Sequence, residues 1–340
     1  MAMLESVSGR PGREIEMEEI RILMARQAAP KIDRIEDVET DHGTMQVAIQ
    51  GEKTKPAMVT FHDIGQNSAS CYGGFFSFAN VQPLLRHFSI YHVNAPGQQE
   101  NAPALPESFV YPTMEQLGEM ILTVCNKLGI KRFVGFGVGA GANVLSRFAI
   151  VHPTMVDALV LINGVAKQAG WTEWGYQKVS NWYLRGKGMT EFSQDYLLWH
   201  HFGKDTTELN HDLVTIFREN LLKLNPMNLA MFVDSWIRRT DLNICRQQDP
   251  EKKKAMKGIK CQVLEITGAF SPHVDDTVDM NSRLDPTISN WMKLSDCGGL
   301  VLEEQPAKVC EALVLFLQGM GYGKLTVALA KDMPHTYPIS

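Results

Sequence analysis

Basic residues do not outnumber acidic residues in this sequence, which argues against partners that carry a high negative charge. The 340 residues include 33 Lys and Arg against 38 Asp and Glu, which gives a net charge of −5 and a pI near 6.1. Domains that bind nucleic acid usually carry a basic patch and a high pI. We therefore expect no nucleic acid among its partners.

Cysteine pairs and long apolar runs are also lacking. The six cysteines are scattered with no C-x-x-C spacing, which suits neither a zinc site nor a disulfide framework. No apolar stretch approaches the roughly 18 residues that span a bilayer. The opening residues, MAMLESVSGRPGREIEMEE, lack the apolar region of a signal peptide. We expect a soluble intracellular protein with reduced thiols, no metal and no cofactor.

What the sequence does contain is a succession of short strands. IEDVETDHGTMQVAIQG alternates apolar and polar residues around Asp41-His42-Gly43, which is typical of a β-hairpin. Four apolar runs follow, each ending in turn residues and leading into a helical segment; they cover 56–65, 88–97, 132–141 and 158–164. Strands this apolar, alternating with helices, predict a parallel sheet covered on both faces.

The strand pattern is interrupted once. Between about Gly170 and Gly258 the pattern is helical and rich in aromatic residues, and in NPMNLAMFVDSWIRR we expect Asn225 to cap a helix with Pro226 in its first turn. Strand-like runs return at 261–270 and 289–299, before a closing helix at 306–321. The expected segments are a flexible N-terminal segment at 1–34, a core at 35–169 and 259–322, a helical cap at 170–258 and a mobile tail at 323–340.

The stretch VGFGVGAGANVL (134–145) carries closely spaced glycines that could belong to a nucleotide site. Gly135-x-Gly137-x-x-Ala140 satisfies the dinucleotide-binding pattern G-x-G-x-x-G/A, and Asp157 follows about 20 residues later. That fingerprint belongs to the first strand–helix turn of its domain, whereas at least two such units precede this one. The position in the chain therefore disfavours a nucleotide site.

The same stretch fits the nucleophile elbow G-x-S-x-G, a tight turn between a strand and a helix. Gly137 and Gly141 stand where the flanking glycines belong, after the fifth expected strand. The residue in the nucleophile position is Gly139, which has no side chain to attack a substrate. The elbow predicts an α/β-hydrolase fold, a mostly parallel eight-stranded sheet flanked by helices with a cap after strand six, and its centre predicts that the nucleophile is lost.

The loops that would carry the rest of a catalytic triad favour the same conclusion. The histidine base should follow the last strand, where the sequence reads SDCGGLVLEEQP and Gly298, Gly299 and Leu300 stand instead, next to Cys297. None of the ten histidines lies there. The preceding loop, GAFSPHVDD, retains Asp275 and Asp276 as candidates for the acid. Cys297 has no basic neighbour in sequence to lower the pKa of its thiol.

Three further groups of residues invite a functional interpretation. HDIG (62–65) resembles the oxyanion loop of epoxide hydrolases and dehalogenases, and we interpret His62 and Asp63 as inherited loop residues with local hydrogen bonds. His200 and His201 are adjacent, and adjacent side chains diverge on a helix, so we expect a structural role. The aromatic residues of 171–199 should pack the cap on the sheet, with a recognition surface as the alternative. The predicted vestigial pocket comprises His62, Asp63, Gly137, Gly139, Gly141, Asp276, Cys297 and Gly298.

These stretches together resemble the N-myc downstream-regulated (NDR) family of α/β-hydrolase-like proteins. The resemblance covers about residues 35–322 and rests on VTFHDIGQN (59–67), YHVNAPGQQE (91–100), VGFGVGAGANVL (134–145) and LSDCGGLVLEEQP (294–306). It implies a catalytically inactive, scaffold-like protein linked to differentiation, stress response, trafficking and signalling. It also implies a mainly cytoplasmic location with membrane-associated and nuclear pools, and protein partners with some peripheral membrane or lipid contact. The tail lacks the family's Arg/Ser/Thr-rich repeats, so regulation through it is not implied.

Three functions remain open at this point. The leading hypothesis is a non-enzymatic interaction protein, because nucleophile and base are both missing beside an intact elbow. The second is an atypical hydrolase that uses Asp63, Asp276 or His273. The third is a small-molecule or lipid-binding module that uses the vestigial pocket.

Overall fold

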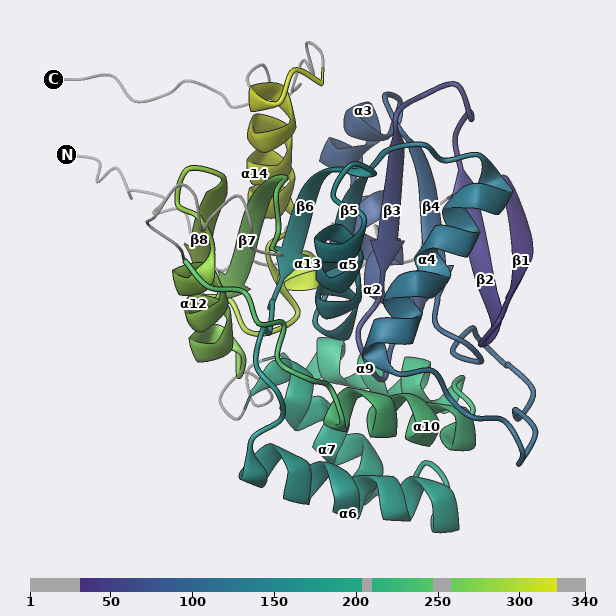
Figure 1. Ribbon diagram of the computed structural model, residues 1–340. Helices are drawn as coiled ribbons and strands as arrows, with labels where there is room; N and C mark the ends of the chain where they lie inside the picture. The colour runs from purple at the N-terminus through teal and green to yellow at the C-terminus, as the bar shows by residue number, and fades with distance from the viewer. Residues whose placement is uncertain (1–30, 204–209, 247–257, 323–340) are drawn as a thin grey trace, which may run out of the picture.

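A single sheet of eight strands forms the centre of the protein (Figure 1). The computed structural model describes residues 31–203, 210–246 and 258–322. The strands are β1 (Arg34–Thr40), β2 (Gly43–Gln50), β3 (Ala57–Phe61), β4 (Ser89–Asn94), β5 (Phe133–Val138), β6 (Val156–Ile162), β7 (Gln262–Gly268) and β8 (Ser289–Leu294). Their order across the sheet is β1-β2-β4-β3-β5-β6-β7-β8. Only β1–β2 and β2–β4 pair antiparallel among these strands, which confirms the predicted mostly parallel sheet.

Helices cover both faces of the sheet because its strands are apolar on both sides. They are α2 (Ser68–Ser77), the short 3₁₀ helix η1 (Ala79–Val81), α3 (Gln82–Leu85), α4 (Met114–Leu128), α5 (Ala140–Val151), α12 (Val274–Arg283), α13 (Val301–Glu304) and α14 (Pro306–Gly319). Neighbouring strand residues divide between two cores: Val59 joins the cluster formed with α4 and α5, whereas Met58 joins the cluster formed with α2 and α14. The alternation of side chains along each strand thus determines which helices it contacts.

In the described part of the chain between β6 and β7, four helices lie beyond the end of the sheet, at the bottom of Figure 1. They are α6 (Trp171–Lys187), α7 (Glu191–Phe202), α9 (His211–Leu222) and α10 (Pro226–Ile237). We refer to these four helices as the cap. Its contact with the loop after β3, where His201 binds Ile64, places it over the carboxyl ends of the parallel strands.

Helix α10 forms as its sequence predicts. The Asn225 side chain accepts hydrogen bonds from the backbone N–H groups of Met227 (3.0 Å) and Asn228 (3.2 Å), and Pro226 occupies the first turn. The predicted apolar stripe is buried: Leu229, Phe232, Val233, Trp236 and Ile237. After α10 the described chain of the predicted cap segment is irregular from 239 to 246, and 247–257 lie outside the described residues.

Some expectations concern residues that the structure does not describe. The predicted flexible N-terminal segment falls outside the described residues except for 31–34, and the predicted tail at 323–340 falls outside them entirely. Within the described ranges, no helix has both the length and the apolar character that crossing a bilayer requires.

A carboxyl group on β7 is buried without a hydrogen-bond partner. Both Glu265 side-chain oxygens lack a partner among the described residues, and the side chain is fully buried. Burial raises the pKa of Glu265 to about 8, because the charged form is poorly solvated there. Glu265 is therefore protonated in the folded protein at neutral pH.

We predict that Glu265 makes the fold less stable as the pH rises. The protonated form supports folding fully below about pH 4.5, and this contribution is lost as the pH rises toward 8. Glu265→Gln should remove this dependence, giving a variant that is more stable than wild type by a few kcal/mol at pH 8, since each pKa unit corresponds to about 1.4 kcal/mol. Urea unfolding of both proteins at pH 5 and pH 8 tests this; an equal pH dependence of the two would contradict it.

Candidate functional site

The glycine run forms a tight turn between β5 and α5. Gly139 is the turn residue, with φ 53° and ψ −112°, a backbone conformation that L side chains rarely adopt. A Cβ on Gly137 would lie 2.6 Å from the backbone of Ala142, and one on Gly141 would overlap the carbonyl oxygen of Phe61. Both flanking glycines are therefore required by the close approach of α5 to the ends of the strands.

The Asp63 carboxylate occupies the centre of this turn. Its Oδ1 accepts hydrogen bonds from the backbone N–H groups of Ile64 and Ala140, both at 2.8 Å. In α/β-hydrolases the oxyanion hole consists of the N–H after the nucleophile and an N–H from the loop after β3. Ala140 and Ile64 hold these two positions, so the hole already contains a negatively charged oxygen from the protein itself.

The space that a nucleophile side chain would need is filled as well. A Cβ on Gly139 would overlap the carboxyl group of Asp63. Asp63 therefore fills the space directly beside Gly139. The interpretation of Asp63 as a residue with only local hydrogen bonds is incomplete, because its contact with Ala140 joins positions 77 residues apart.

His62 does make the local hydrogen bonds expected of it. Its Nε2 accepts from the N–H of Ala95 at 3.1 Å, and its Nδ1 donates to the carbonyl oxygen of Asp63 at 2.7 Å. Burial lowers the pKa of His62 to about 4, so the ring is neutral and one nitrogen can accept while the other donates. These two hydrogen bonds of His62 hold the backbone of the loop in place at Asp63.

Two cap histidines approach the other oxygen of Asp63. At the end of α7, Nε2 of His200 lies 3.5 Å and Nδ1 of His201 lies 3.8 Å from Oδ2. Nε2 of His201 donates to the carbonyl oxygen of Ile64 at 2.8 Å. Sequence analysis missed this cluster, because adjacent histidines do not indicate that both rings flank one loop residue more than 130 positions away.

The protonation states in this buried cluster follow from its surroundings. Burial alone would raise the pKa of Asp63, but His200, His201 and the Ala140 N–H hold it well below its ordinary value. Burial lowers the pKa of His200, and that of His201 to about 3. The cluster therefore consists of a carboxylate and two neutral imidazoles.

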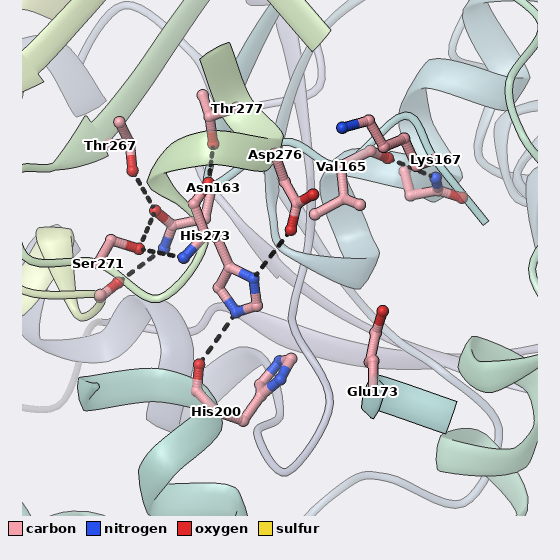
Figure 2. A network of polar contacts seen from close by, with 12 residues as sticks. Asn163, Val165, Lys167, Glu173, His200, Thr267, Ser271, His273, Asp276 and Thr277 are labelled. Atoms are coloured by element: carbon pink, nitrogen blue, oxygen red, sulfur yellow. Dashed lines mark hydrogen bonds and ion pairs between the residues drawn. The ribbon is translucent and has the colours of Figure 1, made fainter. Parts of the chain in front are cut away.

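His273 lies between His200 and Asp276 (Figure 2). Nε2 of His273 donates to the carbonyl oxygen of His200 at 3.0 Å, and Nδ1 lies 4.0 Å from the Asp276 carboxylate. Burial alone would lower the pKa of His273, but the nearby carboxylates of Asp276, Asp63 and Glu173 together raise it. Asp276 thus contacts His273, and His273 in turn binds the backbone of α7.

Asn163, which sequence analysis did not single out, holds the loops after β6, β7 and β8 together. Its Oδ1 accepts from the hydroxyls of Thr267 (2.9 Å) and Ser271 (3.1 Å), and its Nδ2 donates to the carbonyl oxygen of Gly299 at 2.8 Å (Figure 2). Its φ of 51° suits Asn, which tolerates the left-handed region. The only sequence signal was an Asn-Gly turn after a buried strand.

The loop in the position of the catalytic base is closely packed. Glu304 accepts from the N–H groups of Gly298 (2.8 Å) and Leu300 (3.2 Å), and a Cβ on Gly299 would overlap the carbonyl oxygen of His201. Cys297 is fully buried, and burial together with Glu304 raises the pKa of its thiol. A reactive cysteine needs the opposite shift.

The outer face of the cap does not match the expectation that its aromatic residues pack on the sheet. Five of the seven that the sequence singles out are exposed: Trp171 (90%), Trp174 (46%), Tyr176 (63%), Trp182 (62%) and Trp199 (50%). On α6 the polar residues Ser180 and Asn181 are buried instead. We call these five residues the outer aromatic face; the alternative, a recognition surface, is the one that their exposure supports.

Solved structures with a similar fold include hydrolases. The protein is similar to a thermophilic esterase from Thermogutta terrifontis, with a TM-score of 0.67 and 18% identity over 84% of this chain and 99% of that chain. It is also similar to the enol-lactonase from Burkholderia xenovorans LB400, with a TM-score of 0.66 and 20% identity over 83% and 100% of the two chains. The fold is therefore that of the α/β-hydrolases, as predicted.

The sequence comparisons show to which family of α/β-hydrolase-like proteins the chain belongs. The model of the Ndr family matches residues 35–324. Protein NDRG1 of Xenopus tropicalis is 43% identical over 289 residues, 84% of this chain and 71% of the relative, and Protein NDRG3 of Xenopus laevis is 41% identical over 84% and 75% of the two. The chain belongs to the Ndr family, which confirms the resemblance recognised in its sequence.

We predict that Gly139 and Asp63 are energetically coupled. Gly139→Ala should destabilise the protein by about 2 kcal/mol or more, because its methyl group would overlap the Asp63 carboxylate. In an Asp63→Ala background the same substitution should cost at least about 1 kcal/mol less. Denaturant unfolding of the two single variants and the double variant measures this coupling. Equal costs in both backgrounds would show that the strain at Gly139 is independent of Asp63.

Proposed function

We propose that this protein acts in the cytoplasm, with membrane-associated and nuclear pools, as a non-enzymatic interaction protein in signalling, differentiation or stress response. The observation that carries the proposal is the Asp63 carboxylate in the position of the oxyanion hole. Acyl transfer requires that hole to receive the oxygen on which negative charge develops. A resident carboxylate takes both N–H donors and repels a second negative charge.

The outer aromatic face supports a protein as the partner. Aromatic side chains are enriched at protein interfaces, and a solvent-exposed apolar surface is unfavourable unless a partner covers it. Two cations beside this face are already engaged, because Lys178 and Arg185 both pair with Asp234. They are thus less available for an acidic membrane surface, which favours a protein over a lipid headgroup.

A second candidate is the atypical hydrolase. It is favoured by the connected series Asp63, His200, His273 and Asp276, which lies where a catalytic site would be. Asp63 would have to leave both N–H groups before it could attack or activate water. The small-molecule or lipid-binding module is less favoured, because Asp63 fills the space beside Gly139.

A hydrolase assay separates the first two candidates. We expect the purified full-length protein to show neither labelling by a fluorophosphonate serine probe nor turnover of an ester and epoxide panel, with an active esterase as positive control. The physical reason is the occupied hole beside a residue without a side chain. Turnover that survives purification and falls in Asp63→Ala or His273→Ala would establish the second candidate instead, and labelling abolished by a point mutation would also contradict the proposal.

A capture experiment tests the outer aromatic face. Proximity labelling in the native cell should show a set of proteins that the wild type labels and that Trp171→Ala/Trp182→Ala labels at least about fivefold less, since a buried interface Trp is worth about 2 kcal/mol or more. Leu315→Ala is the matched control, an exposed apolar residue (60%) on α14 at the opposite end of the molecule (Figure 1). Equal labelling by all three proteins, or loss of vesicle binding alone, would contradict a protein-binding role for this face.

A further inference from the structure

Three buried side chains direct ligand atoms at one point between the cap and the sheet. The side chains of Asp63, His200 and His201 each offer one donor atom, and these atoms lie within 4.8 Å of one another. Each of the three residues is at most 4% exposed. We call them the Asp-His-His cluster. A carboxylate and two imidazoles are a ligand set that transition metals use.

The spacing within the cluster is too long for hydrogen bonds between its members. Nε2 of His200 and Nδ1 of His201 lie 3.5 and 3.8 Å from Oδ2 of Asp63, whereas N–H···O bonds span roughly 2.7–3.2 Å. Ligands about 2.0–2.2 Å from a tetrahedral zinc ion lie roughly 3.3–3.6 Å apart. The first distance falls within this range, and the second exceeds it by a few tenths of an ångström.

The second nitrogen of His201 determines which atom faces the carboxylate. Nε2 must carry the hydrogen, because its partner, the carbonyl oxygen of Ile64, can only accept. Nδ1 is then the ring nitrogen that faces Oδ2 of Asp63, so a cation between these two atoms would be bound by both. A backbone carbonyl bound to the other nitrogen is also the usual way in which proteins orient a metal-binding histidine.

His200 provides a separate indication. Its Nε2 is buried and makes no hydrogen bond with any described residue. A buried polar atom without a partner is costly, and exceptions call for an explanation such as an ion. The carbonyl oxygen of His200 is held by His273, which fixes the helix end from which the ring extends.

Asp63 can serve a metal without leaving the oxyanion hole. Oδ1 is engaged by the N–H groups of Ile64 and Ala140, which leaves Oδ2 as the ligand atom. These hydrogen bonds fix the carboxylate in the way that surrounding groups fix metal ligands in known sites. The two roles of the carboxylate are therefore compatible.

We propose that the Asp-His-His cluster binds one divalent transition-metal ion of the zinc class, which fastens the cap to the loop after β3. Imidazole nitrogens favour zinc and its neighbours over calcium or magnesium, which take mainly oxygen ligands. Three protein ligands leave one tetrahedral position for a water molecule. The ion would join His200 and His201 of α7 to Asp63 beside the elbow, so it would stabilise the folded protein. This effect does not depend on whether the protein interacts through its outer aromatic face.

Metal titration of the full-length protein tests the proposal. After chelator treatment and transfer to metal-free buffer with a phosphine reductant, Zn²⁺ should bind with a stoichiometry of one ion per chain. It should raise the unfolding temperature by roughly 5–10 °C at about 100 times Kd. Co²⁺ should give the visible absorption of a tetrahedral site with nitrogen and oxygen ligands. Absence of both effects would overturn the proposal. A proton shared between Asp63 and a histidine would then explain why these side chains lie close together.

Matched variants assign the site. His200→Gln and Asp63→Asn should each weaken zinc binding by at least about 100-fold, since even residues that only orient a ligand contribute about 10–100-fold. His152→Gln, at a partly buried histidine paired with Glu119, should bind as wild type does. Unchanged affinity in the first two variants would overturn the proposal. If they do not fold, the Co²⁺ spectrum of the wild type decides, because thiolate-to-metal absorption would place the ion on a cysteine instead.

Discussion

The carboxylate of Asp63 is the group on which the arrangement of the site depends. One oxygen satisfies the N–H groups of Ile64 and Ala140, and the other faces the two cap histidines. This position exists only because Gly139 has no Cβ. The carboxylate therefore fits in this position only with glycine at 139. From there it joins the loop after β3, the elbow and the cap.

Much of the fold could be predicted because its signals are local. The elbow glycines, the Asn225 cap and the apolar stripe of α10 depend on residues only a few positions apart. The carboxylate in the hole could not be predicted, since HDIG and the elbow are separate motifs that meet only when β3 and β5 pair. The same holds for His201, whose partner Ile64 lies 137 positions away.

The cap aromatics show a different limit of sequence reasoning. A helix rich in Trp and Tyr normally buries them, and this expectation fails for α6 because of where the helix lies. Helix α6 packs against α10 and α7, so it forms the outermost layer of the cap (Figure 1). It contacts them through buried residues such as Ser180, Asn181 and Leu184, and its tryptophans face solvent. The composition of a segment shows which residue types its helix carries, but it does not show whether that helix lies inside the cap or on its surface.

The filled hole also explains how an elbow can persist without a side chain at its centre. Two buried N–H groups that converge on one point need an acceptor, and leaving them unsatisfied would cost about 1–3 kcal/mol each. In a working hydrolase, water or substrate provides that acceptor. In this protein Asp63 does so; burial alone would raise its pKa, but His200, His201 and the Ala140 N–H hold it low. The same carboxylate lies beside the two cap histidines, so the loop after β3, the elbow and the cap meet at one group in the folded protein.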